Sequence, residues 1–190
     1  MLKVPKYMRG YSFFILIITS IALSVSCSKL NDSTEMNLLI TPPSPVSQIA
    51  TKTSIDTGQT FATIPIRFNL DSIIQLQNKR LSSKNISSTR LNNFVLTITD
   101  VDTAITFANY EQLRIFIDKD GRTSNLLASL NPSDAKVKTL NIPVTATDNP
   151  VGEFINDGQF RFLIKGKLRR STTAPSTIRL NSSFRVLLAL

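Results

Sequence analysis

The chain has 190 residues, a formal net charge of +9 and no histidine. The lack of histidine excludes Ser-His-Asp and Cys-His triads and removes the commonest protein ligand of transition metals. Cys27 is the only cysteine, which excludes a disulfide within the chain. A folded part of this protein must therefore be stabilised by packing, and the length suits one domain with flanking segments.

The first 26 residues have the three parts of an export signal. Three basic residues come first, the stretch 11–25 is mostly apolar, and the small residue Ser26 precedes Cys27. A membrane-spanning helix needs about 20 apolar residues. This run is shorter and contains four hydroxyl residues. We therefore expect a signal that is cleaved rather than a permanent anchor.

The sequence LSVSC at residues 23–27 resembles the lipobox of bacterial lipoproteins, in the looser form found in Bacteroidetes. The resemblance covers residues 1 to 32. It implies that lipid is attached to the thiol of Cys27, that the chain is cut before this residue, and that the new amine is acylated. Because two or more acyl chains anchor a protein stably, no spanning helix is then needed.

The resemblance also bears on localisation. Ser28 rather than Asp follows the cysteine, which by analogy with the known sorting rule favours the outer membrane. One acid and one base follow within 28–32, so the sequence leaves the periplasmic and the surface faces both open. Removal of the signal would lower the net charge from +9 to +6.

We predict three parts of the chain: a lipoprotein signal peptide at 1–26, a tether at 27–47 and a folded domain at 48–190. Three prolines within 42–45 preclude a helix in the tether and favour a stiff spacer. The short apolar patch 36–40 is long enough to add a strand. A tether that lifts the domain from a membrane is the simplest interpretation.

The domain alternates apolar and polar residues with period two, which is typical of strands with one buried face. Strands are predicted at 60–70, 93–100, 113–118, 126–130, 136–146, 159–169, 176–181 and 184–190. No long amphipathic helix interrupts them. The predicted fold class is all-β and mainly antiparallel, a β-sandwich with one or two short helical turns. Pro65 predicts an edge strand or a bulge.

The connections carry turn and cap signals. Asp71 is expected to cap a helix at 72–79 that packs Ile73, Ile74 and Leu76 on the sheet, and 81–90 is expected to be an exposed loop. Residues 118–121 predict a hairpin turn rather than a calcium loop, because no acid follows the glycine. A second helical turn is expected to begin at 149–150.

The residues predict no catalytic centre, no cofactor and no metal site. The acids are scattered, the six glycines form no phosphate-binding loop, and Cys27 is not a free nucleophile once acylated. A Ser-Lys pair hidden among the serines is the remaining enzymatic alternative. We therefore expect a protein that is not an enzyme.

One candidate surface remains, a basic row on the outward face of strand 159–169. It is made of Arg161, Lys165, Lys167 and Arg169. The row predicts either an anionic partner or a solvated sheet face whose charges prevent edge-to-edge association. Exposed aromatics would favour a sugar-binding module, but there is no tryptophan, and Tyr110 is the only tyrosine beyond the signal.

These features favour a non-enzymatic, lipid-anchored protein of the cell envelope, a structural or accessory interaction module. The alternative is a module that binds a glycan or an anionic polymer, and a more remote one is a cryptic hydrolase. The expected partners are the membrane, through the lipid on Cys27, and an envelope protein or a glycan. Nucleic acid is not expected.

Overall fold

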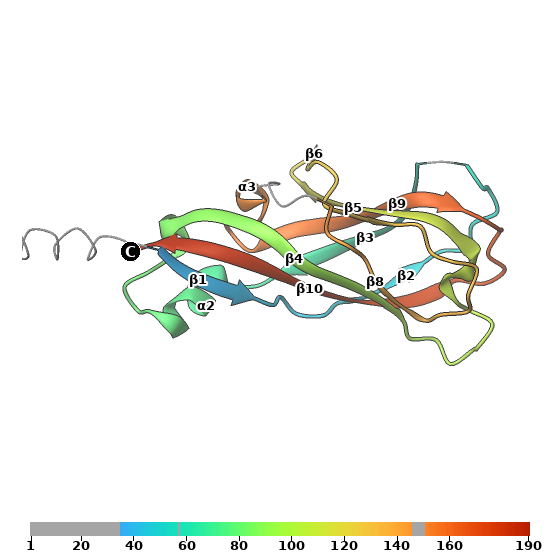
Figure 1. The fold of residues 1–190 in the computed structure, drawn as a ribbon, viewed down its shortest axis with the longest axis horizontal. Helices are drawn as coiled ribbons and strands as arrows, with labels where there is room; N and C mark the ends of the chain where they lie inside the picture. Colours follow the sequence, from blue (N-terminus) through green and yellow to red (C-terminus); the bar gives the residue numbers. More distant parts are fainter. Residues whose placement is uncertain (1–34, 57, 146–150) are drawn as a thin grey trace, which may run out of the picture. The chain divides into compact units, whose positions relative to one another are not determined.

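A computed structural model describes residues 35–56, 58–145 and 151–190, so the predicted signal peptide and Cys27 lie outside the described residues. The chain divides into residues 1–36 and 37–190, and the second unit contains almost all of the described structure. The described part has ten strands in two antiparallel sheets packed together, the predicted all-β sandwich (Figure 1).

The first sheet, sheet A, is built around the longest strand. It has the order β1-β10-β4-β8, with β2 also paired to β10. Its strands are β1 (Glu35–Ile40), β2 (Val46–Ile49), β4 (Ile86–Ile98), β8 (Thr139–Asn141) and β10 (Ser176–Ala189). The two strands predicted at 176–181 and 184–190 are one strand, β10, because a bulge after Ser183 keeps the pairing with β4.

Residues of the predicted tether belong to sheet A. Residues 35–40 and 46–47 are strand residues, and Leu38 and Ile40 are buried. Between β1 and β2 the chain still follows β10, because Leu180 donates its N–H to the carbonyl oxygen of Pro45 at 3.0 Å. The proline-rich stretch thus lies along the sheet as a connection between two strands.

The second sheet, sheet B, has the order β3-β9-β5-β6, with β7 also paired to β5. Its strands are β3 (Gln59–Arg67), β5 (Tyr110–Lys119), β6 (Arg122–Thr123), β7 (Ala128–Leu130) and β9 (Gln159–Leu168). Pro65 lies in β3, which is an edge strand as expected from its missing N–H. The turn between β5 and β6 has positive φ at Asp120 and Gly121, so this prediction of a hairpin turn is confirmed.

Phenylalanine rings join the two sheets in the core. Phe94 of β4 contacts Phe162 of β9 with ring centroids 5.0 Å apart, and Phe184 of β10 stacks on Phe162 at 6.2 Å. Phe160 packs edge-on against Phe184 at 5.8 Å. Burying one such side chain contributes about 1.5–3 kcal/mol. The alternating pattern of β9 placed Phe160, Phe162 and Leu168 inward, as predicted.

Two predicted lengths are wrong. Residues 86–90 of the predicted loop belong to β4, because their backbone pairs with the last residues of β10. The strand predicted at 136–146 is shorter, with only Thr139–Asn141 in β8 and Val144 in an isolated bridge to Ala128. Both strand lengths depend on pairing with strands that are distant in the sequence, and the local sequence pattern does not predict that pairing.

The helix after β3 begins earlier than predicted. Helix α2 (Leu70–Gln77) is capped by Asn69, whose side-chain oxygen accepts the N–H of Ser72 at 2.9 Å. Leu70 and Ile74 are buried, whereas Leu76 is 84% exposed. Asp71 is therefore a residue of the first turn rather than the cap.

Three shorter helical segments complete the fold. They are η1 (Ser83–Asn85), η2 (Phe107–Asn109) and α3 (Gly152–Ile155), and residues 149–150 lie outside the described part. Helices α2 and α3 lie at the end of the sandwich where β10 finishes (Figure 1).

Candidate functional site

The predicted basic row lies on β9, on the outer face of sheet B, but its cations are largely neutralised. Arg161 forms an ion pair with Asp118 of β5, a carboxylate that is otherwise buried. Lys167 forms an ion pair with Glu111 at 2.9 Å. These pairs link β9 to β5 across the sheet, so both side chains have a structural partner.

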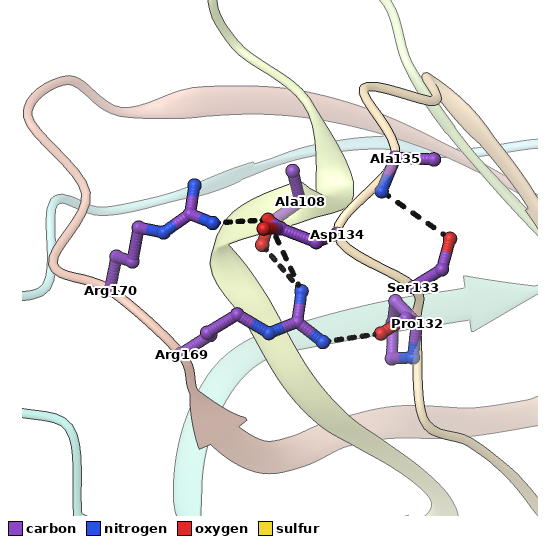
Figure 2. Close-up of polar contacts among 7 residues, drawn as sticks. All are labelled: Ala108, Pro132, Ser133, Asp134, Ala135, Arg169 and Arg170. Carbon is purple, nitrogen blue, oxygen red and sulfur yellow. Dashed lines mark hydrogen bonds and ion pairs between the residues drawn. The ribbon is translucent and has the colours of Figure 1, made fainter.

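Arg169 connects the end of β9 to two loops. Its Nη1 donates to the carbonyl oxygen of Ala108 at 2.8 Å, and its Nη2 donates to that of Pro132 at 2.7 Å. Asp134 lies 3.7 Å from the same guanidinium and also pairs with Arg170 (Figure 2). A planar guanidinium with several N–H donors can make all of these contacts at once. Together they hold the loop before β8 against η2.

Lys165 is the member of the row without an ion pair among the described residues. Its ammonium lies over the ring of Phe116, 5.5 Å from the ring centroid, and it is directly opposite Arg114 on β5. The structure thus divides the predicted row into three cations that face carboxylates and one that faces a ring. It does not present a uniform basic stripe.

Tyr110 is not an exposed aromatic platform. It is 2% exposed, and its ring packs edge-on against Phe61 with centroids 5.2 Å apart. Burial raises the pKa of Tyr110, and a hydrogen bond with the side chain of Ser176 opposes this effect. Tyr110 is therefore a core residue.

A polar groove lies at the end of the sandwich where β3 finishes and β9 begins. We call it the end groove and define it by Arg67, Phe68, Asp71, Ser83, Asn156, Asp157 and Gln159. Its volume is about 640 Å³, within the usual range for ligand sites. A second hollow of about 450 Å³ shares Ser83 and Asn156 with it and continues along the start of β4.

Hydrogen bonds hold the walls of the end groove in place. Asp71 accepts the N–H of Ser83 at 2.6 Å, which ties α2 to η1. This bond, helped by the Ser83 side chain, lowers the pKa of Asp71. The carboxylate is therefore ionised at neutral pH.

Lys119 organises the opposite wall. Its ammonium contacts the Asp157 carboxylate at 2.9 Å and the Asn156 side-chain oxygen at 3.1 Å. Burial acts to raise the pKa of Asp157, but the hydrogen bonds from Lys119 and from the Gln159 N–H outweigh it, so the pKa is lowered. Both groove carboxylates are thus charged and fixed.

The sequence did not predict these groove residues as a site, and it named only Asp71, as a helix cap. They come from the end of β3, the start of α2, the segment η1 and the turn before β9, which lies about 85 residues after α2 begins. The turn signal at 156–158 and the polar run after Ile66 are visible in the sequence. The two segments lie side by side because β3 pairs with β9 in the sheet.

Three other features considered from the sequence are a metal site, a calcium loop and a membrane-spanning helix. No cluster of three acidic or cysteine side chains that could hold a metal ion occurs among them. Asp118, in the turn considered for calcium, instead pairs with Arg161. In the same part of the chain, no helix is long and apolar enough to cross a membrane.

Comparison with known proteins yields no family. No family model matches the chain, and no curated protein matches it. A search of solved structures finds a chain described as Desmodium yellow mottle tymovirus, with 12% sequence identity and a TM-score of 0.24. That match covers 82% of this chain and 90% of the viral chain.

Proposed function

We propose that this protein is a lipid-anchored, non-catalytic interaction module of a bacterial cell envelope. The observation that carries the proposal is the position of Cys27, which directly follows a small residue at the end of an apolar run. A chain without histidine lacks the commonest general base near neutral pH, which supports a role in binding rather than catalysis. Ser28 after the cysteine supports the outer membrane as the destination.

The test compares the full chain with its Cys27→Ser variant in a bacterial host. The wild type is expected to partition into the detergent phase and to incorporate a labelled fatty acid, because two or more acyl chains bind a bilayer stably. Cys27→Ser is expected to lose both. Equal partitioning and labelling of the two proteins would contradict the proposal.

A control variant separates lipidation from general damage to the signal. Ser28→Ala leaves the cysteine and the apolar run intact, so it is expected to be labelled like the wild type. Protease added to intact cells then reports whether the anchored protein is exposed at the surface.

A further inference from the structure

The end groove combines hydrogen-bonding groups with one aromatic ring. Phe68 is half-buried, and its ring packs edge-on against Phe160 with centroids 6.2 Å apart, which fixes its orientation. Asp71, Asn156 and Asp157 provide acceptors, and their oxygens are already positioned by bonds to the protein. Such a site costs little reorganisation when a ligand binds.

The charges of the groove disfavour an anionic ligand. Two ionised carboxylates, Asp71 and Asp157, line the groove, and the Lys119 ammonium beside it is already paired with Asp157. Arg67 is exposed and has no ion pair among the described residues, so it is the cationic donor of the site. The amide side chains of Asn156 and Gln159 can both donate and accept hydrogen bonds. This mixture of donors and acceptors suits a neutral ligand rich in hydroxyl groups.

The neighbouring hollow adds an independent observation. Thr89 is fully buried there, and its Oγ1 is the only buried side-chain polar atom of the described residues without a hydrogen-bond partner. A buried hydroxyl without a hydrogen-bond partner is destabilising, so a ligand that supplies the partner would be favoured. Ser87 and Ser88 line the same hollow, so a ligand hydroxyl there would meet several hydroxyl partners.

We propose that the end groove and its neighbouring hollow bind a neutral oligosaccharide. Carboxylate, amide and guanidinium groups hydrogen-bond to sugar hydroxyls, and the Phe68 ring packs against the apolar face of a pyranose ring. The inference rests on the proposed role as an interaction module but does not depend on lipid attachment. The two proposals can therefore fail separately.

The test titrates the purified full chain, in detergent, with maltohexaose, cellohexaose and mannohexaose, and with dextran sulfate as an anionic control. At least one neutral probe is expected to bind. Arg67→Gln and Phe68→Leu are each expected to weaken binding about tenfold, which corresponds to about 1.4 kcal/mol, because the first removes a charged hydrogen-bond donor and the second an aromatic face.

Arg114→Gln is the matched control. Arg114 is also an exposed arginine of sheet B, but it lies on β5 outside the groove, and its change removes the same charge. This variant is expected to bind within about twofold of the wild type, because distant sites act independently.

Three results would overturn the proposal. In the first, no neutral probe binds at about 5 mM, which corresponds to less than about 3 kcal/mol of binding free energy. In the second, Arg67→Gln and Arg114→Gln weaken binding equally. In the third, only dextran sulfate binds and added salt abolishes its binding, which indicates nonspecific charge attraction.

Discussion

Phe68 and Gly158 are joined backbone to backbone at the base of the end groove. The Phe68 N–H donates to the Gly158 carbonyl oxygen at 3.0 Å. Gly158 has a φ of +72°, and a Cβ atom there would lie 2.0 Å from the Phe68 carbonyl oxygen. Only glycine allows the turn before β9 to approach the end of β3 so closely.

Gly158→Ala is expected to lower the free energy of unfolding by about 2–4 kcal/mol, since strain at positive φ adds to a backbone clash. Gly121→Ala is the control, because Gly121 has a φ of +79° but no heavy atom within 4 Å of the added Cβ. That variant should lose about 1 kcal/mol. Urea unfolding measures both, and equal losses would contradict the close approach.

The carboxylate of Asp71 is expected to make stability depend on acid pH. Its pKa lies below the ordinary 3.8 in the folded protein. Its stabilising contribution is therefore present above pH 3.8 and is lost as the pH falls through the lower, folded value. Asp71→Asn should cost about 0.5 kcal/mol at pH 7, because the group is exposed and screened, and the difference from the wild type should shrink in acid.

The control for this prediction is the neighbouring cap. Asn69→Ala removes the side chain that accepts the Ser72 N–H and should cost about 1 kcal/mol. Asn does not titrate, so this loss should be the same at pH 3 and pH 7. Urea unfolding at several pH values measures both variants, and a pH-independent loss for Asp71→Asn would contradict the assignment.

Tyr110 is expected to make stability depend on alkaline pH. Its folded pKa is raised above 10.0 by burial, so the unfolded chain loses the phenolic proton first. Stability is unaffected below pH 10 and falls as the pH rises from there toward the folded pKa. Tyr110→Phe should cost about 1 kcal/mol at pH 7, through the lost contact with Ser176, and this deficit should shrink above pH 10.

The comparison of the two proteins by denaturant unfolding from pH 8 to 11 isolates this effect, because they differ only in the phenolic hydroxyl of residue 110. A difference that stays constant across this range would show that Tyr110 is not desolvated in the native state.

By itself, the amino-acid sequence determined which faces of strands β3 and β9 are buried. Successive side chains of a strand point to opposite sides, so Ile64, Ile66, Phe160 and Phe162 could be assigned to the core from period two alone. The edge position of Pro65 and the turn at Asp120 and Gly121 followed equally from local backbone chemistry. The sandwich follows from these local rules.

Only the tertiary structure decided the partners. The alternation of apolar and polar residues does not show which acid pairs with Arg161, nor that Asn69 rather than Asp71 caps α2. Both depend on neighbours that only the folded structure brings together. The end groove arises because the antiparallel pairing of β3 with β9 brings the end of one to the start of the other. The local sequence determines which face of a strand a side chain occupies, but its contact partners are determined by packing between segments that are distant in the sequence.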